Sequence, residues 1–332
     1  MFYRTLGQLK TPVSSLGIGA MSFTDFYGKT DTQSSHNILA AAIELGINHL
    51  DTSDIYGSGL SETRIGLFIK ANHEAKKFFK IATKGGIERG STGKTRFNNS
   101  KNYLTKCLDD SLRRLKVEQV ELYYVHRREA ERPIEDVTET LKSLVESGKT
   151  KQIGFSEISP NSLALATSVF PVAAVQSEYS LSTRYPELGL VQKTRDLGAS
   201  LVAFSPVGRS LLTDFPHDQN KVKAMQFLKE NPRFVEPNLS RNIDASEGFR
   251  SLARQMGLSA AALAIAWLLH KDSHILPIPG TRSVERLKSM SQGASKKLSL
   301  EEIAEIESTL PLGWAHGDRY STNQWIGPEK YC

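Results

Sequence analysis

Residues 48–62 read Asn-His-Leu-Asp-Thr-Ser-Asp-Ile-Tyr-Gly-Ser-Gly-Leu-Ser-Glu. A short apolar strand ends in the carboxylate of Asp51, a turn brings Tyr56 beside a glycine, and Ser61 and Glu62 begin a helix. A tyrosine hydroxyl with its ordinary pKa of about 10 exchanges protons near neutral pH only if a cation and a buried carboxylate act on it. Asp51 is a candidate for that carboxylate. These residues alone also fit an ordinary strand end and turn, so the rest of the chain has to decide.

Beyond this stretch, short apolar strands alternate with longer segments of helical period. The predicted strands are residues 16–19, 47–51, 80–84, 122–126, 152–156, 173–177, 201–205 and 275–279. The clearest predicted helices are residues 32–45, 61–70, 100–115, 134–146 and 187–197. Strands that alternate with helices pair in parallel, and eight such units can close on themselves. We therefore predict an α/β fold, a (β/α)8 TIM barrel, formed by one domain over residues 1–332.

An open doubly wound sheet is the alternative, and it would carry the dinucleotide fingerprint G-x-G-x-x-G after its first strand. Gly17 and Gly19 supply the first two glycines, but Ser22 stands where the third is needed. The closed barrel is therefore favoured.

Three segments depart from strict alternation. Residues 3–9, with Gly7 in the middle, predict a small N-terminal hairpin. A long loop of roughly forty residues, 206–244, follows the seventh strand, and long loops on the active face of a barrel are usually functional lids. A further helix and a C-terminal tail follow Ser299, and the tail carries Trp314, Tyr320 and Trp325. We expect this tail to shape the substrate pocket, although aromatic residues that simply pack against the barrel wall would give the same pattern.

Composition limits the class of protein. The net charge of +6 comes from Lys and Arg that are spread along the chain, which is typical of a solvated surface and not of a nucleic-acid interface. Cys107 and Cys332 are the two cysteines, and no Cys/His spacing indicates a metal site or a disulfide framework. The N-terminus lacks the apolar core of a signal peptide, and the longest apolar run, 260–269, is too short to span a bilayer. We therefore expect a cytoplasmic protein with no metal, nucleic-acid or membrane partner, as a monomer or homo-oligomer.

Active-site groups of a barrel come from the C-terminal ends of different strands. Charged and polar residues recur at those ends, which core packing does not explain. Read in turn, the strand ends carry Asp51, Lys84, His126, Ser156 with Glu157, Gln176, and Phe204 with Ser205, of which all but Phe204 are charged or polar. A cation that can pair with a carboxylate is what a proton-donating tyrosine needs. We therefore group Asp51, Tyr56, Lys84 and His126 as one catalytic set.

These residues resemble the aldo-keto reductases over almost the whole chain. The resemblance rests on Asp-x-x-x-x-Tyr-Gly at 51–57, on Lys84, on His126 after Leu-Tyr-Tyr-Val, and on Ile-Pro-Gly-Thr-Arg-Ser at 278–283. With Phe-Ser-Pro-Val-Gly at 204–208 and Asn-Pro-Arg-Phe at 231–234, the chain looks most like the branch that includes pyridoxal reductases and general aldehyde reductases.

The resemblance implies NADPH-dependent reduction of a small carbonyl substrate, pyridoxal among the candidates. Tyr56 would be the general acid, Lys84 held by Asp51 would stabilise the tyrosinate, and His126 would orient the carbonyl. The nicotinamide would stack on Phe204. Its carboxamide would be held by Ser156, Glu157 and Gln176, although asparagine is commoner than glutamate at position 157 in the family.

Residues 204–208 and 280–286 complete the cofactor site that the resemblance implies, through Ser205, Pro206, Gly208, Gly280, Thr281, Arg282 and Arg286. The second segment follows the last strand and begins a helix, where free backbone N–H groups favour anions. Arg282 and Arg286 would add charge-assisted bonds to the 2′-phosphate of NADPH. Ser289 and Met290 stand where many relatives carry the Glu and Asn that contact adenine.

The sequence leaves two other interpretations, one of a loop and one of the function. Gly-Ser-Thr-Gly-Lys-Thr at 90–95 is similar to a P-loop, but the full motif needs a glycine at position 88, where Glu88 stands. A nicotinamide-binding regulatory or redox-sensing subunit is the alternative function, because the same barrel serves as a cofactor-reading partner of potassium channels. Such a subunit could keep the catalytic set and turn over little substrate.

Overall fold

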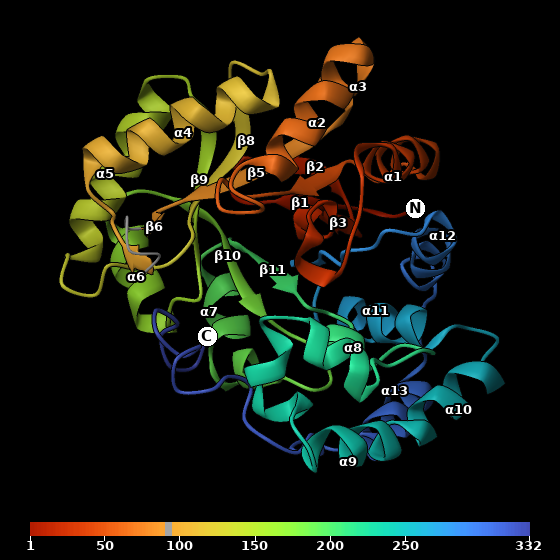
Figure 1. The fold of residues 1–332 in the computed structure, drawn as a ribbon. Coiled ribbons are helices and arrows are strands. Elements are labelled where there is room, and N and C mark those ends of the chain that lie inside the picture. Colours follow the sequence, from red (N-terminus) through yellow and green to blue (C-terminus); the bar gives the residue numbers. More distant parts are fainter. Residues whose placement is uncertain (90–94) are drawn as a thin grey trace.

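A computed structural model describes residues 1–89 and 95–332. Eight parallel strands form one sheet, in which each strand hydrogen-bonds to the next along the chain (Figure 1). They are β3 Gly17–Gly19, β4 His49–Asp51, β5 Lys80–Gly85, β8 Val120–Val125, β9 Thr150–Ser156, β10 Val172–Glu178, β11 Ser200–Phe204 and β12 Ile275–Pro277. The backbone N–H of Gly19 donates to the carbonyl of Pro279 at 3.0 Å and so links the first strand to the segment after the last. The predicted (β/α)8 barrel is confirmed, with all eight strands in the predicted places.

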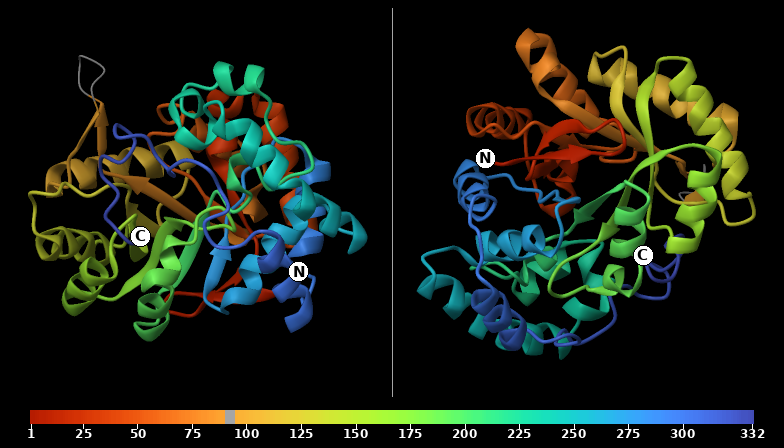
Figure 2. Two further views of the ribbon diagram at one scale, coloured as in Figure 1. Left: turned by 90° about the horizontal axis from the view of Figure 1, so that it is seen from below. Right: turned by 180° about the vertical axis from the view of Figure 1, so that it is seen from behind.

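Helices surround the strands on the outside (Figures 1 and 2). Those of the barrel are α1 Thr32–Leu45, α2 Leu60–Ala71, α3 His73–Phe78, α4 Lys101–Leu115, α5 Ile134–Glu146, α6 Pro160–Val169, α7 Leu190–Asp196, α11 Ala260–Lys271 and α12 Val284–Gly293. Local sequence sets their ends: the Asp31 side chain accepts from the Ser34 N–H before α1, and Gly46 ends α1 with a left-handed backbone, φ 71°.

The predicted helix at 187–197 is wrong in one respect. The structure divides it into a short 3₁₀ turn, Tyr185–Leu188, and α7. Gly189 lies between them with φ 136°, a backbone conformation that glycine adopts and that interrupts the helical hydrogen bonds.

An N-terminal hairpin closes the end of the barrel opposite the predicted site. Its strands are β1 Tyr3–Leu6 and β2 Thr11–Ser14, so the hairpin extends further than the predicted 3–9, with its turn after Gly7. Leu6 and Val13 pack into one cluster with side chains of the barrel interior, such as Leu122 and Val202. This end is filled with apolar side chains, which leaves the C-terminal ends of the strands for polar groups.

The segment after β11 is more ordered than the predicted long loop. It contains α8 Gln219–Ala224, α9 Asn238–Ala245 and α10 Glu247–Gln255, together with short 3₁₀ turns. A small apolar cluster holds its first part together, made by Leu211, Val222, Met225, Leu228, Phe234 and Leu239. The chain then passes through α13 Leu300–Thr309 into the tail, whose Trp314 indole donates to the Leu181 carbonyl at 2.9 Å.

The short antiparallel pair β6 Ile87–Arg89 and β7 Thr95–Phe97 flanks residues 90–94. The P-loop-like stretch therefore lies, except for Thr95, outside the described residues.

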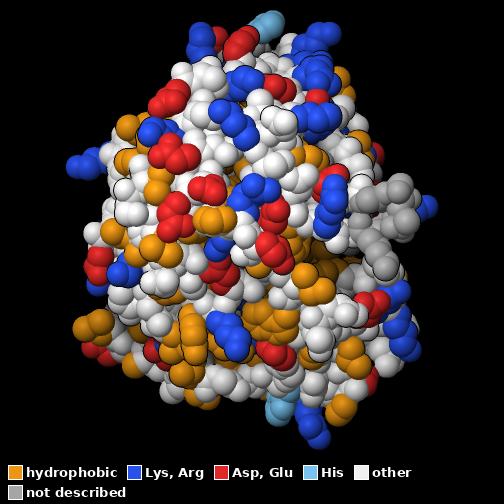
Figure 3. Space-filling view, turned by 90° about the vertical axis from the view of Figure 1, so that its left-hand side faces the viewer, with side chains coloured by type: hydrophobic (Ala, Val, Ile, Leu, Met, Phe, Trp, Pro, Cys, Tyr) orange, Lys and Arg blue, Asp and Glu red, His pale blue; other side chains and the backbone are white. Residues whose placement is uncertain are grey.

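Charged side chains of both signs are mixed on the surface in Figure 3, as Lys and Arg are spread along the sequence. Lys, Arg, Asp and Glu side chains are interspersed on the face seen in Figure 3 and do not gather into a patch of one sign.

Within the described ranges, no single helix has both the length and the apolarity to cross a membrane, although the bent pair Asn238–Gln255 and Ala260–Lys271 meets those criteria by length and composition. Among the same residues, no three His, Cys, Asp or Glu side chains are grouped as metal ligands would be.

Candidate active site

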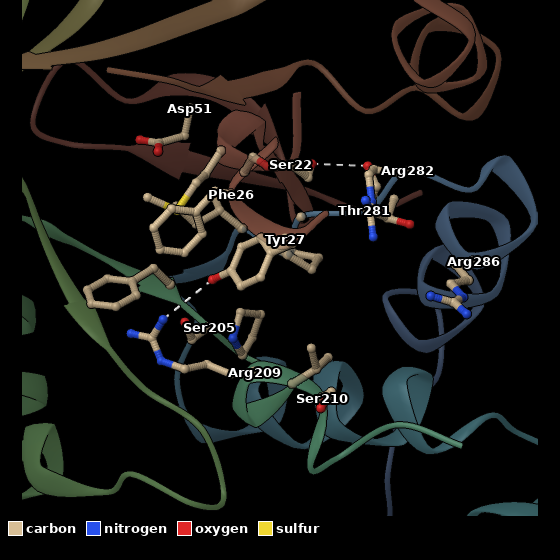
Figure 4. Close-up of a pocket in the computed structure, with 18 of the residues that line it drawn as sticks. Ser22, Phe26, Tyr27, Asp51, Ser205, Arg209, Ser210, Thr281, Arg282 and Arg286 are labelled. Atoms are coloured by element: carbon tan, nitrogen blue, oxygen red, sulfur yellow. Dashed lines mark hydrogen bonds between the residues drawn. The ribbon is translucent and has the colours of Figure 1, made fainter. Parts of the chain in front are cut away.

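A cavity of about 800 Å³ opens at the C-terminal ends of the barrel strands. Asp51, Tyr56 and His126 line one part of it, and Arg282 and Arg286 line another. Figure 4 shows Asp51 and Arg286 on opposite sides of the cavity, with Tyr27 between them. The volume is within the range of small-molecule sites.

The register of the strands brings Asp51 and Lys84, two residues of the predicted catalytic set, close together. Asp51 in β4 is in register with Ala82 in β5, and Lys84 lies two residues further along β5, so both side chains point into the barrel. The Lys84 ammonium donates to Asp51 Oδ1 at 2.5 Å, to the Thr52 carbonyl at 2.8 Å and to Tyr56 Oη at 3.2 Å. The Lys84 side chain is fully buried and that of Asp51 is 2% exposed. One buried ammonium thus connects the carboxylate to the tyrosine hydroxyl.

Burial and charge set the protonation states of these groups. Burial raises the pKa of Tyr56 above its ordinary value, and the Lys84 cation offsets this only in part. Burial alone would lower the pKa of Lys84, but the charge and hydrogen bonds of Asp51 and Tyr56 together outweigh it, and the pKa is raised. Near neutral pH, Tyr56 therefore keeps its proton and Lys84 its charge.

His126 follows the end of β8 and completes the set. Its ring lies edge-on to the Tyr56 ring, with 5.7 Å between the centroids. Burial, with Arg127 and Lys84 nearby, holds the pKa of His126 well below its usual range, so the imidazole is neutral. Its Nδ1 lies 3.0 Å from the Ser53 hydroxyl, which leaves Nε2 for the cavity.

Most residues of the predicted cofactor site share this cavity. They are Ser156, Gln176, Phe204, Ser205, Pro206, Gly280, Thr281, Arg282 and Arg286. The Gln176 amide donates to Asp51 Oδ2 at 2.7 Å, which ties this group to the catalytic set. Ser205, directly after β11, has a left-handed backbone with φ 50°, and such conformations in non-glycine residues are concentrated at functional sites.

Cations and a helix N-terminus form the far end of the cavity. The Ser283 side chain caps α12 by accepting from the Arg286 N–H at 3.2 Å. Arg282 precedes the helix, so the two arginines are not both helical, yet both line the cavity. The pKa of His217 is lowered by burial and further by Lys221, Arg282 and Arg286, which shows that these charges share one region.

Two predicted cofactor residues do not line the cavity. Glu157 is buried with φ 60°, and its carboxylate pairs with the buried guanidinium of Arg319 and accepts from the Glu178 N–H. Gly208 is buried with φ 57° against the Ser182 hydroxyl, where a Cβ would lie 2.9 Å from that oxygen. Both positions shape the wall behind the cavity.

Residues that the sequence did not single out also line it, notably Tyr27, Arg127 and Arg209. The Arg209 guanidinium donates to Glu178 Oε2 at 2.9 Å and lies 4.6 Å from the centroid of the Phe227 ring. Three arginines surround Glu178 and, against the effect of burial, lower its pKa to about 2. Glu178 ends β10, so the rule of charged strand ends could have identified it; no sequence signal indicated Arg209.

Comparison with known proteins adds the family. Residues 15–311 match the model of the aldo/keto reductase family. The chain is 35% identical over 312 residues to "Aldo-keto reductase yakc [NADP(+)]" of Schizosaccharomyces pombe, covering 93% of this chain and 92% of that protein. It is 36% identical over 316 residues to "Probable aldo-keto reductase 1" of Glycine max, covering 95% and 90%.

Solved structures agree in fold. The aldo-keto reductase AKR11C1 from Bacillus halodurans, in its holo form, superposes with a TM-score of 0.77 at 26% identity, covering 98% of this chain and 99% of that one. The glycerol dehydrogenase AKR11B4 from Gluconobacter oxydans gives 0.81 at 24% identity, covering 93% and 94%, which shows the shared fold.

Proposed function

The chain belongs to the aldo/keto reductase family, and on that premise we propose that it reduces small aldehydes and ketones to alcohols with NADPH as the hydride donor. The observation that carries the proposal is the buried Lys84 ammonium, which bonds to both the Asp51 carboxylate and the Tyr56 hydroxyl. A relative with 35% identity bears NADP(+) in its name, which supports the choice of cofactor.

The residues of the cavity fit such a cofactor. Arg209 has a buried Nε with no hydrogen-bond partner in the described part of the chain, a donor that is costly to leave unpaired at the wall of a ligand site. Arg282 and Arg286 supply positive charge for a 2′-phosphate, and Phe204 supplies a flat apolar ring for the nicotinamide. Ser156 and Gln176 would hold the carboxamide, and the bound nicotinamide would supply the hydride.

Tyr56 would act as the general acid. Its raised pKa keeps the proton in place until a carbonyl oxygen gains negative charge and draws it away. The tyrosinate that results is stabilised by Lys84, whose charge Asp51 maintains. His126, neutral because of its lowered pKa, would hydrogen-bond to the carbonyl oxygen through Nε2 and orient it toward Tyr56.

The test is a steady-state assay that follows NADPH oxidation with a panel of aldehydes of graded size, pyridoxal among them, alongside NADPH titration by fluorescence. We expect turnover with several aldehydes and a clear preference for NADPH over NADH. Tight NADPH binding without turnover of any aldehyde would contradict the proposal and indicate a sensing subunit. The two relatives with 35% and 36% identity are aldo-keto reductases by name, so that alternative is not favoured.

A further inference from the structure

Behind the catalytic set, two side chains that the proposed mechanism does not use, Ser53 and Asp54, form a row with His126. Ser53 Oγ lies 3.1 Å from Asp54 Oδ1 on one side and 3.0 Å from His126 Nδ1 on the other. Neither Ser53 nor Asp54 lines the cavity, whereas His126 does. The row therefore connects a carboxyl group outside the cavity to an imidazole inside it.

The proton of the Ser53 hydroxyl can be donated to more than one acceptor. The Ser53 hydroxyl has one proton, and its two neighbours in the row, as well as the Lys84 carbonyl at 3.3 Å, could accept it. An ionised Asp54 can only accept, so it takes the Ser53 proton, and Ser53 must then accept from the Nδ1–H of His126. A protonated Asp54 can donate to Ser53, which frees the Ser53 proton for Nδ1.

We propose that Ser53 is a positioning residue that selects the tautomer of His126, and that the charge of Asp54 decides the selection. With Asp54 ionised, the His126 proton lies on Nδ1 and Nε2 presents a lone pair to the cavity. With Asp54 neutral, the proton lies on Nε2, which can then donate to a carbonyl oxygen. Because the ring is neutral in both states, the change moves a proton between its two nitrogens without adding charge to the site.

The surroundings of Asp54 shift its pKa so that the carboxyl group changes its charge at a pH that experiments can reach. Burial and the Glu62 carboxylate raise its pKa to about 6, while hydrogen bonds from Cys107 and Ser53 and the charge of Arg114 oppose the rise. The Arg114 charge is itself shared, because its Nε donates to Glu62 at 2.7 Å. The other titratable groups that sense Asp54 are phenols with raised pKa values, Tyr103 on α4 and Tyr123 on β8. We expect the tautomer to change as the pH passes through about 6.

The kinetic consequence rests on the proposed reductase function. Carbonyl reduction needs a donor at Nε2, so it should be favoured below the transition, where Asp54 is protonated. Alcohol oxidation passes through the same transition state in reverse, with its proton going to the Tyr56 oxygen, so it needs the same donor at Nε2 and should also be slower above the transition. Ser53 and Asp54 would thus set, through His126, the fraction of the enzyme that is competent in either direction.

The first experiment reads the tautomer directly and needs no turnover. The chain has eight histidines. Nitrogen-15 NMR on protein labelled at histidine, with the His126 resonances assigned by their loss in His126→Gln, distinguishes a protonated from an unprotonated ring nitrogen. We expect the proton on Nδ1 at pH 8 and on Nε2 at pH 5. The same tautomer at both pH values, or a doubly protonated ring at pH 5, would overturn the proposal.

Variants of Asp54 test the origin of the switch. In Asp54→Asn the side-chain oxygen would accept from Cys107 and the amide would donate to Ser53. In Asp54→Ala the carboxylate is absent, and the Lys84 carbonyl, at 3.3 Å, competes with the closer Nδ1 for the Ser53 proton. Both should hold the proton on Nε2 from pH 5 to pH 8. A tautomer change that persists in both variants would show that Asp54 does not decide it, whether or not the enzyme reduces aldehydes.

Kinetics then provide the functional reading. The pH dependence of kcat for reduction is compared between the wild type and Asp54→Asn. As the pH rises from 5 to 8, kcat of the wild type should fall about tenfold more than kcat of the variant. A factor of ten corresponds to the free energy of one hydrogen bond in the transition state. Ser53→Ala should lose this difference and Ser53→Thr, which keeps the hydroxyl, should restore it. Identical profiles for wild type and Asp54→Asn, with the NMR switch present, would separate the tautomer from catalysis.

Discussion

Two buried ion pairs lie at the C-terminal end of the barrel, and they differ in what surrounds them. Lys84 and Asp51 belong to neighbouring strands, and the third partner of the ammonium is Tyr56, which lines the cavity. Arg319 and Glu157 join the C-terminal tail to the residue after β9, and neither of them lines the cavity. Both side chains of the second pair are fully buried, as is Lys84 in the first. Burial of a charge pair therefore does not by itself mark a catalytic centre. In the first pair Asp51 itself lines the cavity beside Tyr56 and His126, whereas the second pair reaches the cavity only through the Tyr320 hydroxyl, to which Arg319 donates at 3.4 Å.

The second pair has a structural consequence. Arg319 also lies 3.5 Å from the Glu178 carboxylate, and the next residue, Tyr320, lines the cavity. The tail is held further by Glu329, whose backbone N–H donates to the Glu157 carbonyl at 2.9 Å. A buried ion pair gains little net free energy, but removing one partner leaves a costly unpaired charge. The pair thus fixes where the tail, with its aromatic ring, meets the barrel.

The largest expected effect tests the catalytic pair. Tyr56→Phe removes the one hydroxyl that Lys84 connects to Asp51, so turnover at saturating aldehyde should fall by roughly 10²–10⁴ while the Kd for NADPH stays near wild type. Lys84→Met should be similarly severe. Steady-state kinetics and cofactor fluorescence measure both quantities. Tyr179→Phe is the control, because that hydroxyl donates to Glu187 at 2.8 Å. If Tyr56→Phe kept more than about a tenth of the turnover, the assignment of the acid would be wrong.

The next effect tests the structural pair. Arg319→Met leaves the Glu157 carboxylate buried without its partner, so the free energy of unfolding should fall by about 3–5 kcal/mol, while turnover per folded molecule keeps its dependence on Tyr56. Urea denaturation measures the loss. Glu157→Gln combined with Arg319→Met should recover part of it.

An exposed ion pair supplies the control for this measurement. Lys76 pairs with Glu118 at 2.6 Å with both side chains exposed, so Lys76→Met should change stability by less than about 1 kcal/mol. Equal stability losses for Arg319→Met and Lys76→Met would remove the distinction between the two kinds of pair.

The two pairs also differ in how far the sequence could predict them. Asp51 and Lys84 end apolar strands, and parallel register with a period of two brings such ends to one place, so the barrel and the meeting of these two side chains could be predicted from local pattern. Arg319 lies 162 residues from Glu157 in an irregular tail, where no periodicity fixes the position of a side chain. The expected role of Glu157 in holding the cofactor came from family resemblance, and the structure instead turns its carboxylate to the tail. Arg209, on a left-handed backbone after β11, was missed for the same reason: its direction depends on loop geometry.

Arg286 at the edge of the cavity allows the buried ion pairs to be compared with an exposed cation. Arg286 is exposed on α12, lines the cavity and has no acid partner among the described ion pairs, so a phosphate would supply one. Arg286→Ala should raise the Kd for NADPH by about tenfold or more and barely affect NADH, because the two cofactors differ by one ribose phosphate. Lys288→Ala, on the same helix but outside the cavity, is the matched control. Equal weakening of both cofactors would assign Arg286 to the shared diphosphate or to the fold.

The smallest expected effect concerns the tail as part of the substrate pocket. Tyr320 lines the cavity and packs edge-on against Phe227 and Trp325, with centroids 6.0 and 5.3 Å away. Tyr320→Ala should enlarge the pocket and change the ratio of kcat/KM for bulky and small aldehydes by about threefold or more, since fit in an apolar pocket discriminates modestly.

Truncation after Pro311 should change that ratio in the same direction, but it also removes Arg319 and so destabilises the protein, which is why the point variant is the sharper test. Trp314→Phe is the control within the tail, because Trp314 bonds to Leu181 and lies outside the cavity. A folded Tyr320→Ala enzyme with an unchanged ratio would show that the Arg319–Glu157 pair anchors a tail that only packs against the barrel. A changed ratio would instead show that Tyr320, which the neighbouring Arg319–Glu157 pair holds against the barrel, forms part of the substrate site.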